Sequence, residues 1–324
     1  MINSKKVTIS LLLYNSAKYL PFCLLSLFNQ TFQDWKLVIL DNHSPDDSLE
    51  IAKKLCVDKN NVKFLTSDKN LGFTSGHNLI MRQVDGEYIM LLNPDTILEQ
   101  DYLEKIVNFL EEHNDAGAVS GKILRYSFNS QEKLTNTRKS RNIDTAGLQL
   151  HKSFQTTDLG SGQIDKGQYN NDQEVFGVSG CLSIYRRQAI AEVNYFDKLF
   201  FSYKEDVDLA FRMQAKEWKA YRVGSAVAYH DRTLNETEDR KKRSSFLNYL
   251  SYRNHLYVLI KNLSLADFLR YGVFITWYEF KKIIYLMLFE QKTLLAWLEV
   301  IKFLPKLIQK RREIKPRSIK SWIK

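Results

Sequence analysis

Cysteine is scarce in this sequence, with three residues among 324. Cys23, Cys56 and Cys181 form no Cys-x-x-Cys pair and lie in apolar or mixed segments. This spacing argues against both a disulfide framework and a zinc site, because each needs clustered or paired cysteines. We expect all three to be buried, reduced thiols.

Long apolar runs are also missing. In the C-terminal part, the most apolar uncharged stretches are Tyr271–Tyr278 and Ile283–Phe289, far short of the roughly 20 residues that cross a bilayer. At the N-terminus a strand-like segment begins at Val7, which leaves no room for the apolar core of a signal peptide. We therefore expect a cytoplasmic protein without a transmembrane helix.

The sequence does have a globular composition and an uneven distribution of charge. Hydrophobic residues make up 44% of the chain and charged residues 26%, which suits a folded protein. Residues 1–239 carry 28 Lys+Arg against 32 Asp+Glu, a net charge of −4, whereas residues 240–324 carry 19 against 5, a net charge of +14. A segment this basic indicates contact with a polyanion, either nucleic acid or an anionic membrane surface.

Apolar strand patterns alternate with helical patterns through the first 120 residues. The predicted strands are Val7–Leu13, Trp35–Leu40, Val62–Leu65 and Tyr88–Leu92, and the predicted helices are Ala17–Asn29, Ser48–Cys56 and Ser75–Gln83. Continuously apolar strands between helices are typical of a parallel sheet covered on both faces. The fold class is therefore α/β.

Polar residues follow each predicted strand: Tyr14, then Asp41, then the loop Asp68–Gly72, then Asn93–Thr96. Ligands of such sheets bind beyond the carboxyl ends of the strands, so these residues are candidates for a binding site.

The second half of the chain begins with a polar, irregular stretch at 125–171, which we interpret as a loop on the acceptor side of a cleft. A helix is predicted from Lys204 to about Trp218, followed by a strand at Ala220–Val223 and by His230.

Seven short motifs carry a resemblance to a known family. In order, they are Leu-Leu-Tyr14-Asn, Val-Ile-Leu-Asp41-Asn, Lys-Asn70-Leu-Gly72-Phe73, Leu-Leu-Asn93-Pro-Asp95-Thr, Ser179-Gly180, Tyr-Lys-Glu205-Asp206-Val-Asp208 and His230. In this order and spacing the sequence resembles the family 2 glycosyltransferases of the GT-A fold over roughly residues 6–310. It is most similar to their bacterial rhamnosyltransferase-like branch.

The resemblance implies that a nucleotide-sugar donor binds at Tyr14, Asp41, Asn70, Gly72, Phe73, Asn93 and Asp95. Asp41 also suits this role chemically, because a carboxylate only accepts hydrogen bonds and uracil and thymine each offer an N3–H donor, whereas cytosine does not. Other interpretations stay open: Asp41 as a cap of the following loop, Tyr14 as a strand-end aromatic residue, and Gly72 as part of an ordinary turn.

Asn93-Pro94-Asp95 resembles the family's metal motif, usually Asp-x-Asp. The resemblance implies Asp95 and His230 as ligands of Mg²⁺ or Mn²⁺, which stabilises the leaving diphosphate. With Asn93 in the first position the site has one carboxylate fewer, so we expect weaker metal binding. His230 could instead be a polar surface residue at a strand end.

Asp206 is the candidate catalytic base, because a sugar hydroxyl needs a carboxylate nearby to take its proton. The resemblance also implies an acceptor site at Ser179, Gly180 and Glu205. Ser202 and Glu205 have the spacing of a helix capping box, which is an additional structural interpretation of Glu205. Ser179 and Gly180 could equally form a buried turn.

The last predicted helix combines two stripes. Apolar residues recur at helical spacing at Leu294, Trp297, Leu298, Ile301, Leu304 and Ile308, and a basic stripe follows at Lys302, Lys306 and Lys310. This pattern favours a helix that lies on an anionic membrane. The alternative is a helical appendage packed on the catalytic domain with a solvated basic face.

Together these expectations give a Rossmann-like GT-A catalytic domain at 1–239 and a basic amphipathic α-helical extension at 240–324. The donor half is about 1–120 and the acceptor half about 121–239. The predicted function is the transfer of a sugar, with inversion at the anomeric carbon, from a dTDP- or UDP-linked donor to a hydroxyl of a glycan acceptor. The first candidate for the donor is dTDP-L-rhamnose, and the first candidate for the acceptor is a glycan linked to polyprenyl diphosphate. This reaction would serve cell-surface polysaccharide synthesis at the inner face of the cell membrane.

Two other functions, a nucleotidyltransferase and a non-catalytic polyanion-binding protein, agree with only part of the sequence. A sugar-phosphate nucleotidyltransferase should have a Gly-rich, Arg-containing first loop, where this chain has Tyr14-Asn15-Ser16. A non-catalytic polyanion-binding protein would explain the basic tail. However, the acidic strand ends would repel nucleic-acid phosphates, so we expect no nucleic acid partner.

Overall fold

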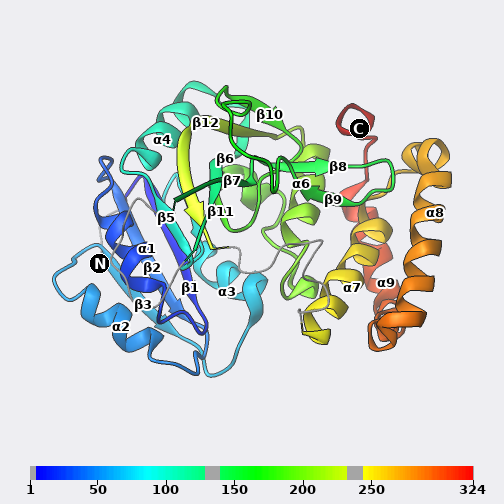
Figure 1. Ribbon diagram of the computed structural model, residues 1–324, viewed down its shortest axis with the longest axis horizontal. Coiled ribbons are helices and arrows are strands. Elements are labelled where there is room, and N and C mark those ends of the chain that lie inside the picture. Colours follow the sequence, from blue (N-terminus) through cyan, green and yellow to red (C-terminus); the bar gives the residue numbers. More distant parts are fainter. Residues whose placement is uncertain (1–4, 128–138, 232–243, 324) are drawn as a thin grey trace.

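A ten-stranded mixed sheet is the central element of the computed structural model, which describes residues 5–127, 139–231 and 244–323. Within these ranges the strand order is β10-β12-β6-β11-β4-β1-β2-β3, with β5 paired to β12 and β7 paired to β6. Figure 1 shows β1–β3 at one end and the C-terminal helices at the other. The prediction of an α/β sheet is confirmed.

The N-terminal half is the parallel part of the sheet, in which β1 pairs with β2 and β4, and β2 pairs with β3. Its elements are β1 (Val7–Leu13), α1 (Leu20–Phe28), β2 (Trp35–Asp41), α2 (Ser48–Leu55), β3 (Val62–Thr66), α3 (Gly72–Met81) and β4 (Tyr88–Leu92). All seven predicted elements are present. Helix α1 begins later than predicted, at Leu20, where Pro21 suits the first turn.

The second half adds antiparallel pairing. Its elements are β5 (Thr96–Leu98), α4 (Tyr102–Glu112), β6 (Ala116–Tyr126), β7 (Lys139–Thr145), β8 (Leu148–Leu150), β9 (Thr156–Asp158), β10 (Gln173–Val175), β11 (Leu182–Arg186), α5 (Arg187–Glu192), the 3₁₀ turn η2 (Lys198–Phe200), α6 (Glu205–Ala215) and β12 (Lys219–His230). Strand β11 runs antiparallel between β4 and β6, and β12 runs parallel to β6. This arrangement brings the start of β11 beside the carboxyl end of β4.

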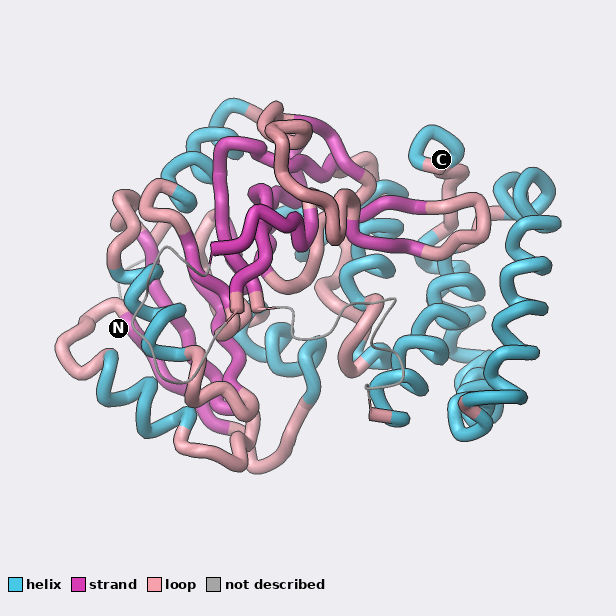
Figure 2. The backbone as a smooth tube through the Cα atoms, in the orientation of Figure 1, coloured by secondary structure: helices cyan, strands magenta, loops and turns pink. Residues whose placement is uncertain are grey.

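Two predictions in this half are wrong. The stretch 125–171 is not a continuous loop, because it contains β7, β8 and β9, short polar strands that are stabilised by pairing (Figure 2). Strand β12 does not end at Val223 but continues to His230 after a register shift at the position of Gly224. A bulge of this kind interrupts the local pattern without ending the strand.

Three helices form the C-terminal extension: α7 (Ser245–Asn262), α8 (Leu265–Phe289) and α9 (Ala296–Ile314), with 3₁₀ turns η3 (Gln291–Leu295) and η4 (Lys320–Trp322). Buried apolar residues of α7 and α9 share one cluster with Phe200 of η2 and Phe211 of α6. Among the described residues, no helix combines the length and apolar character needed to cross a membrane.

Candidate active site

A cleft of about 370 Å³ opens where β4, β11, α6 and β12 meet. Eight of the predicted site residues line it: Phe73, Asn93, Asp95, Ser179, Gly180, Glu205, Asp206 and His230. They come from five separate segments of the chain, which the sheet order brings to one edge.

Four predicted donor residues lie outside this cleft, at the neighbouring strand ends. Tyr14 follows β1 and is half exposed, and Asp41 ends β2 beside it in register with Leu13. The Asp41 carboxylate accepts the backbone N–H of Ser44 at 3.3 Å. That contact is the capping alternative anticipated for this residue, and it leaves the second carboxylate oxygen for other partners.

The loop before α3 is held by side-chain amides. The Asn70 side-chain oxygen accepts the backbone N–H of Gly72 at 2.8 Å and the side-chain N–H of Asn42 at 3.0 Å. Gly72 has φ +74°, and a Cβ there would lie 2.4 Å from the ring of Phe201. This position therefore requires glycine for both conformation and space.

Asp206 stands at the first turn of α6 and faces the start of β11. One carboxylate oxygen accepts the backbone N–H of Gly180 at 3.0 Å, and the other accepts the N–H of Val207 at 2.8 Å. A Cβ on Gly180 would lie within 3.5 to 3.7 Å of Phe73, Glu205 and Asp206. Glycine thus keeps open the floor of the cleft next to this carboxylate.

Glu205 is buried beside Asp206. The predicted capping box is not formed, because α6 begins at Glu205 itself and its cap residue is Lys204, in a left-handed conformation. One oxygen of Glu205 has no hydrogen-bond partner among the described residues. Burial, followed by the charge of Asp206, raises the pKa of Glu205 to about 8, so its side chain is mostly protonated at neutral pH.

The pKa of Asp206 is also raised. Burial is the main cause and Asp158 adds to it, although the Gly180 hydrogen bond and Lys204 act in the opposite direction. A carboxylate with a raised pKa, placed in a cleft, is a stronger proton acceptor than an exposed aspartate.

Helix α7 of the extension holds the loop that leads into α6. The side-chain amide of Asn254 donates to the carbonyls of Phe200, Ser202 and Tyr203 at 2.9, 2.8 and 2.6 Å. Phe201, Tyr203 and Lys204 all have positive φ, a conformation that costs free energy and needs external support. The extension therefore shapes the cleft. No motif in the sequence pointed to Asn254.

His230 lies between two carboxylates. Its Nε2 is 3.4 Å from Asp95 Oδ1, and its Nδ1 is 2.8 Å from Asp144 Oδ2. Burial alone would lower the pKa of His230, but Asp95 and Asp144 raise it well above the usual value. The arrangement thus favours a positive charge at this position.

These residues fit a divalent cation. Asp95 Oδ1 is buried without a hydrogen-bond partner among the described residues, and it faces the histidine nitrogen that Asp144 does not occupy. A carboxylate that orients a metal-binding histidine through its other nitrogen is a common second layer of such sites. Asp144 was missed because it falls in the stretch interpreted as a loop.

Cys181 offers an alternative ligand set with Asp144 and His230, whose ligand atoms lie within 4.8 Å of one another. Burial raises the pKa of the Cys181 thiol to about 11, so it stays protonated and binds hard cations poorly. The oxygen of Asp95 is the better partner for Mg²⁺ or Mn²⁺. All three cysteines are free and buried, as predicted.

The mixed sheet and the cleft with acidic residues at its strand ends belong to the GT-A class of folds, as the family match and the solved structures given next show. Residues 8–193 match the family described as Glycosyl transferase family 2, and the chain belongs to that family.

Among curated relatives, an uncharacterized glycosyltransferase from Haemophilus influenzae is 30% identical over 113 residues, which cover 35% of this chain and 45% of the relative. The match covers less than half of the length of this Haemophilus relative, and the same holds for GlyA and GlyG from Streptococcus pneumoniae.

Two solved structures show the same fold. GalNAc-T7 with UDP, GalNAc and Mn²⁺ gives a TM-score of 0.63 at 12% identity, covering 82% of this chain and 49% of that one. TarS from S. aureus in complex with UDP gives a TM-score of 0.52 at 20% identity, covering 80% of this chain and 67% of that one.

Proposed function

We propose that the protein is an inverting glycosyltransferase that uses Asp206 as its general base. The observation that carries this proposal is the position of the Asp206 carboxylate, fixed by the Gly180 N–H in the same cleft as Asp95 and His230. A base and a site for the leaving diphosphate in one cleft are the parts that a direct displacement needs.

The reaction is a single displacement. The acceptor hydroxyl oxygen forms a bond to the anomeric carbon, and the bond from that carbon to the donor phosphate oxygen breaks on the opposite side. The electron pair of the broken bond leaves with the nucleotide diphosphate. The hydroxyl proton passes to Asp206, and the protonated Glu205 beside it limits the negative charge around the base.

In this proposal Asp95 and His230 hold the divalent cation, and Asp144 orients the His230 ring. A bound Mg²⁺ or Mn²⁺ would supply charge stabilisation for the leaving diphosphate. With Asn93 instead of a second carboxylate at the motif, we expect moderate metal affinity. A structure of the same fold holds Mn²⁺ together with UDP, which supports the assignment.

For the donor we propose a uridine or thymidine diphosphate sugar, with dTDP-L-rhamnose as the first candidate from the resemblance to the rhamnosyltransferase-like branch. Asp41 would accept the N3–H of the base, with Tyr14 bordering the ring. Asn70, Gly72 and Phe73 would line the diphosphate and sugar. Solved structures of the same fold bind UDP and also GDP-mannose, so the choice of a pyrimidine rests on Asp41.

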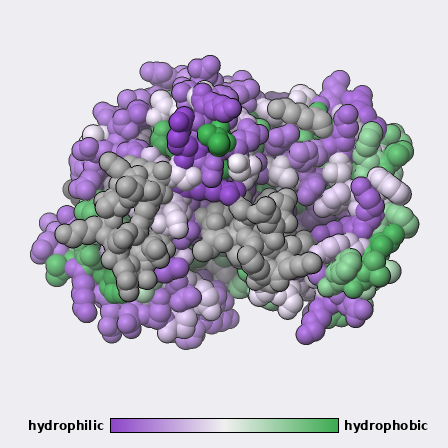
Figure 3. Space-filling model, in the orientation of Figure 1, coloured by the Kyte–Doolittle hydropathy of each residue, from purple (hydrophilic) through white to green (hydrophobic). Residues whose placement is uncertain are grey.

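For the acceptor we propose a lipid-linked glycan, bound over Ser179, Gly180 and Glu205, at the cytoplasmic face of an anionic membrane. Helix α8 supports this location, because Leu269, Val273 and Trp277 form one stripe and are 77%, 82% and 58% exposed. Figure 3 shows apolar surface over this helix. We retain 1–239 as the catalytic domain and 240–324 as the extension that meets the membrane.

The lysine stripe of α9 does not contribute to that contact as a whole. Lys310 pairs with Asp197 at 3.2 Å and Lys306 lines a second cavity on the side of the catalytic domain. The apolar stripe of α9, including Ile301 and Leu304, is exposed. The membrane contact proposed here therefore rests on the apolar face of α8 and α9 and on the overall charge of the extension.

A thermal-shift series with UDP, dTDP, GDP and CDP, each with and without Mn²⁺, tests the donor site, because ligands that bind the native state raise the melting temperature. We expect UDP and dTDP with Mn²⁺ to give the largest shifts in melting temperature. In Asp95→Asn, we expect the additional shift caused by Mn²⁺ to be lost. Asp41→Asn should reduce the discrimination against CDP, since an amide can donate to cytosine N3. Equal shifts for all four nucleotides would contradict the proposal.

A further inference from the structure

A second cavity, of about 430 Å³, lies behind α6, between η2, the C-terminal half of α6 and helix α9. It shares no lining residue with the catalytic cleft. Arg212 in its wall is six residues after Asp206, which corresponds to about 9 Å along the helix axis. The cavity is therefore a separate site, joined to the cleft by one helix.

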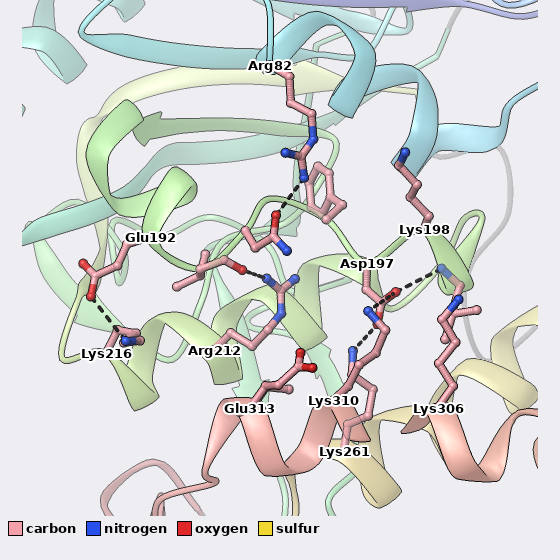
Figure 4. A pocket seen from close by; sticks show the side chains of 15 residues that line it. Arg82, Glu192, Asp197, Lys198, Arg212, Lys216, Lys261, Lys306, Lys310 and Glu313 are labelled. Carbon is pink, nitrogen blue, oxygen red and sulfur yellow. Dashed lines mark hydrogen bonds and ion pairs between the residues drawn. The ribbon is translucent and has the colours of Figure 1, made fainter. Parts of the chain in front are cut away.

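The lining of this cavity is strongly basic. Seven of its side chains are Lys or Arg and three are Asp or Glu. Figure 4 shows side chains from several elements, among them Arg212, Lys198 and Lys306, gathered around the same space. A volume of this size is in the range of small-molecule sites, which start at about 300 Å³.

Part of the positive charge is already compensated. Lys261 binds both Asp197 and Asp208 at 2.6 Å, and the Arg212 Nε binds Asp208 at 2.9 Å. Lys310 is 3.2 Å from Asp197. Three cations share two carboxylates in these pairs, so the group keeps one positive charge while the positions of its cationic side chains are fixed.

Three cationic groups of the lining, Arg82, Lys198 and Lys306, have no carboxylate partner among the described residues, although Arg82 donates to the side-chain oxygen of Asn194. The Arg212 Nη2 is buried and has no hydrogen-bond partner among the described residues. Since a buried polar group without a partner costs free energy, the arrangement is expected to gain most from an anionic ligand with several acceptor oxygens.

We propose that this cavity binds a phosphate or diphosphate group. Such a group has the charge that two ammonium groups and one guanidinium balance, and its oxygens match the donor geometry of arginine. A single carboxylate has fewer oxygens and half the charge of a phosphate dianion, so it satisfies this donor set less completely. The ligand is either a soluble phosphate ester or the phosphate headgroup of a lipid.

Isothermal titration of the full chain with inorganic pyrophosphate in EDTA tests the site without donor or metal, so the result does not depend on transfer activity. We expect saturable binding that the double variant Lys198→Gln/Lys306→Gln weakens at least about tenfold. The control Lys292→Gln/Lys302→Gln removes the same charge from exposed positions outside the cavity, and should bind within about twofold of wild type.

Vesicles separate the two sources of the phosphate. If a lipid headgroup enters, binding to phosphatidic acid vesicles should exceed binding to phosphatidylserine vesicles of equal charge, and pyrophosphate should remove the difference. If the ligand is soluble, the calorimetric result should hold with no such preference. Absence of saturable pyrophosphate binding by the wild type, or equal affinities for the two double variants, would overturn the proposal.

Discussion

Two sides of the first turn of α6 place acidic residues in opposite environments. On the side of the cleft, burial raises the pKa values of Glu205 and Asp206, and one oxygen of Glu205 has no partner among the described residues. Two residues after Asp206, Asp208 is fully buried. Burial would raise its pKa too, but Lys261 and Arg212 lower it instead.

Burial alone therefore does not decide whether a carboxyl group is charged. Asp208 receives two cations and the amide of Asn262 at 2.9 Å, so its charge is stabilised and the helix is anchored to α7. Asp206 receives only backbone N–H groups through the hydrogen bonds given above. Within one helical turn, Asp206 is thus suited to proton transfer and Asp208 to stability.

The largest expected effect is on catalysis. Asp206→Asn removes the proton acceptor but keeps size and polarity, so the rate of transfer should fall by roughly 10²- to 10⁴-fold. Affinity for the donor nucleotide, measured by titration, should stay close to the wild-type value. Near-normal turnover in this variant would remove Asp206 from the mechanism.

The opposite outcome is expected two residues later. Asp208→Asn leaves the buried Arg212 without its carboxylate partner and Lys261 with Asp197 alone among the described residues. This loss should lower the free energy of unfolding by about 3–5 kcal/mol. Urea unfolding at pH 7 measures this loss, with Asp206→Asn as the matched control of nearly unchanged stability. Equal free energies of unfolding for the two variants would show that Asp208 contributes no more to stability than Asp206 does.

Glu205 should make stability depend on pH. Its pKa of about 8 in the folded state exceeds the value of about 4.3 for an exposed glutamate. The stabilisation from the protonated form is complete below about pH 4.3 and is lost as the pH rises to about 8.

Glu205→Gln should therefore match the wild type near pH 4.5 and be more stable at pH 8.5, with roughly 2–4 °C in Tm for each kcal/mol. Thermal unfolding across this range measures the difference. Glu112→Gln, at an exposed position of α4, serves as the control. Parallel pH profiles for wild type and Glu205→Gln would contradict the assignment.

The smallest expected effect is on membrane binding by the extension, where α8 presents an exposed apolar stripe. The triple change Leu269→Ser, Val273→Ser and Trp277→Ser on α8 should weaken binding to anionic vesicles about tenfold or more, because it removes apolar area that enters the interface.

A matched control takes three exposed apolar residues at the other end of the molecule, with Leu25→Ser, Leu55→Ser and Val57→Ser, and should bind vesicles normally. Vesicle flotation at low and high salt measures both variants, and salt should weaken wild-type binding. No wild-type binding at low salt would show that the apolar stripe has another role, such as contact with a second copy of the chain.

Local patterns in the sequence were enough for the parallel half of the sheet. Strands β1 to β4 are mostly apolar, and polar residues follow each of them. Both the elements and the candidate residues at their ends could therefore be predicted. Asp95 was found in this way, at the end of β4, whereas Gly180, Asp206 and His230 were predicted from the resemblance to the family 2 glycosyltransferases. The structure gathers all four in one cleft.

The sequence by itself thus determined the fold class, the family resemblance and the residue types at the strand ends, because each depends on patterns within a few residues. Only the tertiary structure decided which charges are compensated. Asp144 reaches His230 across 86 positions and Asn254 reaches Tyr203 across 51, and contacts of such separation leave no local signal. The pKa contrast along α6 arises from the same cause, since Lys261 comes from a helix 53 residues away from Asp208.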